Sequence, residues 1–214
     1  MIKRTILIGT LAALVLSAVA MGATVVGTKH DLSTYLTTGS QVCVFCHTPH
    51  GANTGTDLKG KAPLWNQTTS TTASYGTYDS NTFNASDLTA LANGTYQVSL
   101  LCMSCHDGTV APGSMYNTPN GNSSNPTIAK LTGSVNMGTD LADDHPVNFT
   151  YASSVSNGDT GLVTESTISE YLDPGGNVQC TSCHDPHDDT VDTDVDFMRV
   201  SLAHSALCTT CHSK

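Results

Sequence analysis

The chain has 214 residues, of which 12% are charged and 6% are aromatic, and its formal net charge is −10. A chain this acidic lacks the basic face that binding to phosphate backbones requires, so nucleic acid is excluded as the expected partner. Thr, Ser, Asn and Gly are abundant, so the chain has little apolar surface of its own to bury in a core.

The first twenty residues have the pattern of a secretory signal peptide. Lys3 and Arg4 precede an apolar run over 5–19, and small-residue cleavage sites end at Ala20 and Ala23. The run is short for a membrane span, so we expect cleavage and no membrane span in the mature protein, with an uncleaved anchor as the alternative. The protein is therefore expected to be exported, to the extracellular space or cell surface or otherwise to the periplasm.

Every cysteine of the chain lies in one of four C-x-x-C-H motifs. This pattern is the attachment site of c-type haem, in which two thiols bond to the porphyrin and the histidine binds the iron. The expected haem-bearing cysteines are Cys43, Cys46, Cys102, Cys105, Cys180, Cys183, Cys208 and Cys211. The expected proximal iron ligands are His47, His106, His184 and His212. The motifs therefore predict four covalently bound haem c groups.

Zinc sites and disulfides are the alternatives to haem, because a C-x-x-C pair alone fits both. The histidine that directly follows each of the four pairs favours haem. A disulfide between cysteines three residues apart is also too local to staple a fold.

Five histidines lie outside the motifs and can supply the second axial ligands. They are His30, His50, His145, His187 and His204. Ligation by two histidines suits electron transfer, because it leaves no open position on the iron. His50 and His187 each follow a motif histidine by three residues across a proline, a tether too short to reach the opposite face of the same haem. Each is therefore expected to bind a different haem, with His30 and His145 completing the set and His204 as the spare.

An internal repeat predicts two haem-pair modules. The order C-x-x-C-H-x-P-H, a spacer, then S-x-L-C-x-x-C-H occurs over 43–106 and again over 180–212. A connector joins the two modules within one domain, 21–214.

The expected fold is mostly irregular chain with short α-helices and little or no β-sheet, cored by haem. The spacers are rich in Gly, Thr, Ser, Asn and Pro, which is typical of loops. Short helices are expected at 86–93, 97–106, 164–172 and 201–212. Because the haems supply the apolar core, we expect poor folding without them.

Residues 185–196 carry six aspartates. Calcium binding is conceivable, but the spacing does not match an EF-hand loop, so a solvated acidic loop is the favoured interpretation.

Four stretches of the chain, 42–50, 101–108, 144–147 and 180–187, resemble the doubled C-x-x-C-H multihaem cytochrome family. In size and haem number the chain is similar to the extracellular tetrahaem cytochromes that polymerise into conductive filaments. The resemblance implies stacked and T-shaped haem pairs with two histidines on each iron, and one distal histidine donated across the subunit interface. It implies that His30, in a K-H-D-L-S segment, is the donor. It also implies a glycine at the position of His204, which agrees with a spare histidine there.

The leading functional hypothesis is electron transfer through four closely packed haems in a subunit of an extracellular filament, without enzymatic activity. The expected partners are other copies of this chain, other redox proteins and extracellular electron acceptors. A monomeric periplasmic tetrahaem electron carrier is the alternative. A multihaem oxyanion reductase is a third hypothesis, but it needs an open iron position, and the surplus of histidines argues against it.

Overall fold

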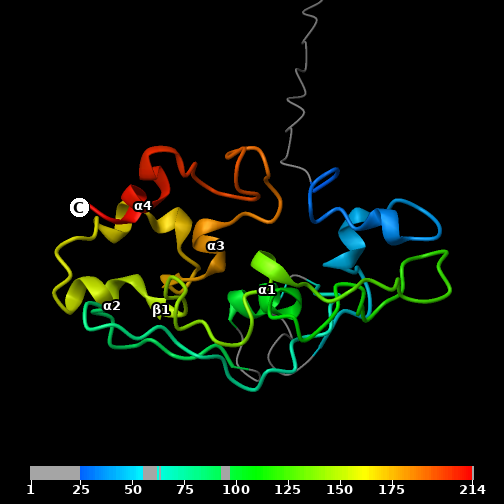
Figure 1. The fold of residues 1–214 in the computed structure, drawn as a ribbon, viewed down its shortest axis with the longest axis horizontal. Coiled ribbons are helices and arrows are strands. Elements are labelled where there is room, and N and C mark those ends of the chain that lie inside the picture. The colour runs from blue at the N-terminus through cyan, green and yellow to red at the C-terminus, as the bar shows by residue number, and fades with distance from the viewer. Residues whose placement is uncertain (1–24, 55–61, 63, 93–96, 214) are drawn as a thin grey trace, which may run out of the picture.

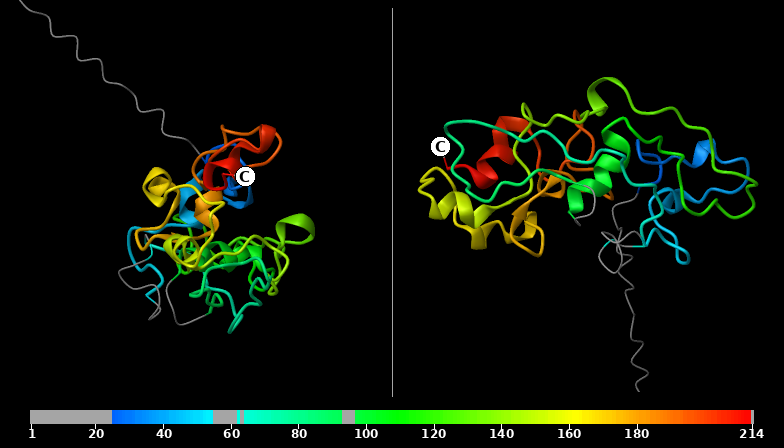
Figure 2. Two further views of the ribbon diagram at one scale, coloured as in Figure 1. Left: turned by 90° about the vertical axis from the view of Figure 1, so that its left-hand side faces the viewer. Right: turned by 90° about the horizontal axis from the view of Figure 1, so that it is seen from below.

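The computed structural model describes residues 25–54, 62, 64–92 and 97–213. The predicted signal peptide lies outside these residues. The described chain is elongated, with the segment after residue 25 toward one end and the C-terminal helix toward the other (Figure 1). Seen from below, these two segments again lie toward opposite ends, with α1 and α3 between them (Figure 2).

Regular secondary structure is sparse, as the sequence predicts. The α-helices are α1 (Val98–His106), α2 (Tyr151–Ser156), α3 (Cys180–Cys183) and α4 (Ala206–Cys211). The 3-10 turns are η1 (Ser33–Tyr35), η2 (Val42–Phe45), η3 (Gly133–Val135), η4 (Glu165–Thr167), η5 (Ser169–Tyr171) and η6 (Ala203–Ser205). The strands β1 (Phe149–Thr150) and β2 (Asn177–Val178) pair antiparallel, with Phe149 opposite Val178. The prediction of a mostly irregular chain with short helices and little β-sheet is therefore confirmed.

Two of the expected helices are present and one is reduced to turns. The helix expected at 97–106 is α1, and the one expected at 201–212 is η6 followed by α4. The chain kinks between these last two, where His204 and Ser205 have φ of 55° and 60°. The segment 164–172 forms η4 and η5 instead of an α-helix.

The prediction of a helix at 86–93 is wrong over 86–92. Residue 93 lies outside the described residues. Here the chain has no regular structure because its polar groups bond to distant segments. The Asp87 carboxylate accepts hydrogen bonds from the backbone N–H (3.2 Å) and hydroxyl (2.6 Å) of Thr150. Farther along, the Leu91 carbonyl accepts from the N–H of Tyr75 at 3.0 Å. These tertiary bonds replace the local bonds of a helix.

The buried apolar side chains include two small clusters. The first contains Tyr75, Leu91, Leu100 and Met103, and it packs around α1. The second contains Phe149, Tyr151, Ile168 and Val178, and it lies around β1 and β2. Packing of α1 against α3 joins the halves of the molecule. Within the described part of the chain, no helix is long and apolar enough to cross a membrane.

Candidate haem sites

Each C-x-x-C-H motif folds as a tight helical turn with its histidine at the end. The backbone N–H of His47 donates to the carbonyl of Cys43 at 2.8 Å, and that of His212 donates to Cys208 at 2.8 Å. The third motif has the same bond, from His184 to Cys180, at 3.0 Å. The turn brings both thiols and the imidazole of a motif together, as attachment of one haem requires.

Three motif histidines face a second imidazole, and in each case the second ring comes from outside the motifs. The pairs are His30 with His106, His47 with His187, and His145 with His212, with ring centres 6.1, 6.1 and 6.4 Å apart. At about 2 Å per metal–nitrogen bond, two imidazoles on opposite sides of one metal ion place their ring centres about 6 Å apart. The spacing therefore fits one iron between the two rings of each pair.

Hydrogen bonds to the Nδ1 atoms of two of these histidines also fit iron ligation. The Nδ1 of His106 lies 2.8 Å from the Val135 carbonyl, and the Nδ1 of His145 lies 3.0 Å from the Pro146 carbonyl. A carbonyl only accepts, so Nδ1 carries the proton and Nε2 keeps the lone pair that a metal needs. Burial lowers the pKa of His145, which favours this neutral form.

The cysteines place consecutive motifs next to one another. Thiols of the second and third motifs touch: Cys102 and Cys180 share a hydrogen bond, which raises the pKa of Cys102 and lowers that of Cys180 to about 7. Burial, then the nearby Cys46 of the first motif, raises the pKa of Cys105 to about 12.

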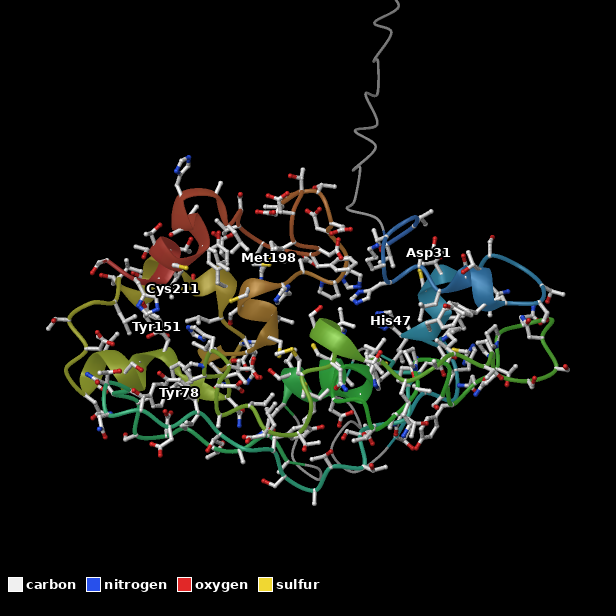
Figure 3. The ribbon with its side chains drawn as sticks, viewed as in Figure 1. Asp31, His47, Tyr78, Tyr151, Met198 and Cys211 are labelled. Carbon is white, nitrogen blue, oxygen red and sulfur yellow. The ribbon has the colours of Figure 1, made fainter. Side chains whose placement is uncertain are left out.

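The fourth motif adjoins the third in the same way. Burial, then the nearby Cys211, raises the pKa of Cys183 to about 11. The motifs therefore follow one another in space in their sequence order. Figure 3 shows His47 of the first motif and Cys211 of the fourth far apart along the long axis.

Three histidines have no ring contact with another described residue: His50, His184 and His204. Burial lowers the pKa of His184, and the nearby His106 lowers it further, while backbone contacts at Asp196 and Phe197 act in the opposite direction. His50 is exposed, and its carbonyl accepts from the Thr48 hydroxyl at 2.8 Å. The pairings place His187 with the first motif, whereas His50, which resembles it in sequence, faces no ring within the described chain.

The ring of His30 contacts residues of the same chain, beside the second motif. Its ring stacks on Phe197 at 4.2 Å, and the two planes are 15° from parallel. Burial lowers its pKa, while a backbone hydrogen bond at Pro186 acts in the opposite direction.

Sequence reasoning missed the buried amides that hold the first motif. Asn66 is fully buried, and its Nδ2 donates to the Val44 carbonyl at 2.6 Å. Gln67 donates to the Phe45 carbonyl at 2.7 Å. The ring of the neighbouring Trp65 lies 6.3 Å from that of His47. In a chain this rich in Asn and Thr, no spacing distinguishes these residues from their neighbours.

A buried carboxylate in the second motif was also missed. Asp107, directly after His106, is 4% exposed. Burial alone would raise its pKa, but hydrogen bonds from Ser70, Tyr75 and Thr109 outweigh burial and hold the pKa below its ordinary value. The C-x-x-C-H pattern carries no signal for the residue that follows it.

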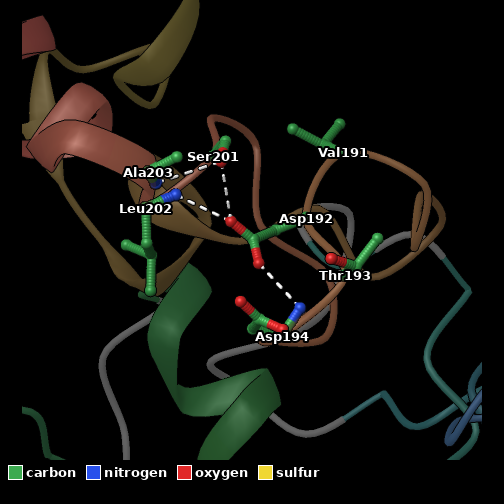
Figure 4. Close-up of a pocket in the computed structure, with 7 residues that line it drawn as sticks. All are labelled: Val191, Asp192, Thr193, Asp194, Ser201, Leu202 and Ala203. Carbon is green, nitrogen blue, oxygen red and sulfur yellow. Dashed lines mark hydrogen bonds between the residues drawn. The ribbon is translucent and has the colours of Figure 1, made fainter.

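The aspartate-rich loop encloses a pocket of about 400 Å³ (Figure 4). The carboxylate of Asp192 points into the loop and accepts from the N–H groups of Asp194 (2.9 Å) and Leu202 (2.7 Å). Among the described residues, no group of three or more His, Cys, Asp or Glu side chains is arranged to hold a metal ion. The aspartate thus closes the loop through hydrogen bonds; the sequence favours a solvated acidic loop here, with calcium binding as the alternative.

A scan of protein-family models and a search of curated proteins each found no match for this chain.

Proposed function

We propose that the protein is an exported tetrahaem c-type cytochrome that conducts electrons along four haems in series. The observation that carries this proposal is the set of three imidazole pairs, each joining one motif histidine to a non-motif histidine at 6.1–6.4 Å. A chain that used its C-x-x-C pairs for zinc or disulfides would have no reason to bring these particular rings together at this spacing.

Haem c, when bound, supplies an iron that alternates between the ferric and ferrous states. The residues of the chain fix where each iron is held. The cysteines would hold the macrocycle, the paired imidazoles would bind its iron, and backbone carbonyls orient the rings of His106 and His145 through Nδ1. The neighbouring thiols of successive motifs keep the four sites close together in sequence order.

We further propose that copies of the chain join end to end, and that His50 of one copy serves the His184 site of the next. His184 is a motif histidine whose ring contacts no second imidazole in the described part of its own chain. His50 is an exposed imidazole on a fixed backbone, because Asn117 donates to its carbonyl at 2.9 Å. His30 serves less well as the shared ligand, since it already faces His106.

Exposed apolar side chains near His50 support an interface there. Leu64 and Tyr116 are 55% and 54% exposed. The backbone of Thr48 bonds to Leu64 at 2.9 Å, and the side chain of Asn117 bonds to His50, so both apolar residues lie on segments in contact with the His50 turn. A second copy that covered these side chains would remove apolar area from water.

The test uses haem-loaded, exported protein examined by electron microscopy and by visible spectroscopy after reduction. Wild type should form filaments with one subunit per axial repeat, contain four haems, and show no spectral change with carbon monoxide. His50→Ala should keep four haems but give dispersed particles, and one reduced iron should now bind carbon monoxide. His204→Ala is the matched control, since it also removes an exposed histidine, and it should behave as wild type.

Two results would redirect the proposal. Dispersed wild-type monomers at every concentration, with no iron open to carbon monoxide, would favour the monomeric carrier. A carbon monoxide shift in wild type would mean an open iron and would favour the reductase. Absence of covalent haem would overturn the proposal altogether.

A further inference from the structure

Asp107 accepts more hydrogen bonds than any other carboxylate in the described part of the chain. None of these bonds comes from a predicted haem ligand. Its Oδ1 accepts from the N–H and hydroxyl of Thr109 at 2.8 and 2.9 Å. Its Oδ2 accepts from the hydroxyls of Tyr75 (2.6 Å), Thr72 (3.2 Å) and Ser70. Every one of these partners donates, so the network is built for the charged form.

This negative charge is buried without a counter-charge. Asp107 is 4% exposed, and within the described part of the chain no ion pair joins it to a cation. The donors are neutral hydroxyl and amide groups, which stabilise the charge without cancelling its field at longer range. A buried field is screened far less than one at the surface.

The charge lies at the second haem site. Asp107 directly follows His106 and caps the C-terminal end of α1, the helix that carries the second motif. Its field therefore reaches the residue that would hold the second haem. The equivalent positions of the other motifs differ: Thr48 and Ser213 are neutral, and the Asp185 side chain is 40% exposed.

We propose that the negative charge of Asp107 tunes the second haem site. It lowers the reduction potential of the haem bound by His106, compared with the same site without this carboxylate. A ferric iron carries one more positive charge than a ferrous iron, so a fixed carboxylate nearby stabilises the ferric state. This inference rests on the proposed function, since it needs a haem at the second motif. It makes the four sites unequal, with one interior site favouring the oxidised state because of its surroundings.

The test is a redox titration of haem-loaded Asp107→Asn, with haem-methyl NMR to assign each potential. The substitution is isosteric, and the hydroxyls around Oδ2 can accept from the new amide as readily as they donate. One potential, assigned to the His106 haem, should become more positive, and its shift should be the largest of the four. Asp107→Thr, which copies the first motif, should shift the same haem in the same direction.

Two controls separate charge from structure. Asp107→Glu keeps the charge and should leave that potential near the wild-type value. Asp143→Asn removes an exposed carboxylate two residues from the predicted ligand His145, and solvent screening should keep its effect smaller.

The outcomes distinguish this inference from the proposed function. Four attached haems with unchanged potentials in both neutral variants would overturn the role of Asp107 and leave the conduit proposal intact. Loss of haem in both neutral variants would assign Asp107 to assembly and would also overturn the inference. A wild-type protein without covalent haem would overturn the proposed function first.

Discussion

Asn66 shows how one buried amide fixes the turn of the first C-x-x-C-H motif. Its backbone N–H donates to the Cys46 carbonyl at 2.8 Å, inside the first motif. Its side chain donates to the carbonyls of Val44 (2.6 Å) and Asn117 (3.2 Å) and accepts from the N–H of Asn117 at 2.9 Å. A loop-rich chain needs such contacts, because few helix or strand bonds are available to order its backbone.

Asn66→Ala should lower the free energy of unfolding by roughly 2–4 kcal/mol, since buried backbone groups would lose their partners. Chemical denaturation of the haem-loaded protein measures this loss. Asn120→Ala, at an exposed position, is the control and should change stability by less than about 0.5 kcal/mol. Equal effects of the two substitutions would contradict the role assigned to Asn66.

At the scale of the elements, the junction of α1 and α3 connects the two halves of the molecule. Ser99 is fully buried in α1, and its hydroxyl donates to the side-chain oxygen of Gln179 at 2.5 Å. The same hydroxyl accepts from the N–H of Cys180, in the first turn of α3, at 3.0 Å. One hydroxyl therefore sets the position of the third motif relative to the second.

Ser99→Ala should cost about 1–3 kcal/mol of stability, because it leaves the Cys180 N–H buried without its partner and removes the shorter of the two bonds to the Gln179 oxygen, which keeps only the Ser99 N–H at 3.3 Å. Thermal unfolding detects this, and Ser123→Ala, on the surface, provides the comparison. If water replaces the hydroxyl, the loss will fall below that range and the junction does not depend on Ser99.

The aspartate-rich loop gives a pH-dependent prediction. Hydrogen bonds from the N–H groups of Leu202 and Asp194 and from the Ser201 hydroxyl lower the pKa of Asp192 from 3.8 to about 2. Because the folded pKa lies below the unfolded one, the stabilisation is complete above pH 4 and disappears as the pH falls to about 2. Corrected for intrinsic rates, hydrogen exchange of the Leu202 N–H should accelerate over that range.

Asp192→Asn should produce the same acceleration already at pH 6 and should remove its pH dependence. Asp188→Asn, which leaves the Leu202 contact in place, is the matched control. Unchanged exchange in Asp192→Asn would show that other contacts close the loop.

Sequence alone predicts elements whose cause is local. The spacing of Cys102, Cys105 and His106 follows a helical turn, so α1 could be predicted. The segment 86–92 could not, because its conformation depends on Thr150, some sixty residues away in the chain. Likewise, the sequence supplies enough histidines for four irons but cannot show which rings meet, and only tertiary packing distinguishes His187 from His50.

At the scale of the whole molecule, the described residues form two small, separate apolar clusters. They share no residue, and each is completed by half-buried side chains such as Leu141 and Leu88. Ordering each residue costs about 1–2 kcal/mol of backbone entropy, which clusters of this size cannot offset over a loop-rich chain. Each haem would add a large apolar body between its two imidazoles, at the positions where the chain itself contributes least.

The full chain with all eight cysteines replaced by alanine, which cannot attach haem, should therefore not fold cooperatively. Far-ultraviolet circular dichroism should show a shallow, nearly linear change on heating, whereas the haem-loaded wild type should give a sigmoidal transition. His204→Ala, with its four haems intact, controls for substitution as such and should melt like wild type. A sigmoidal melt of the cysteine-free chain would contradict this prediction. It would show that the polypeptide forms a cooperative core without haem and that the haems are not needed for folding.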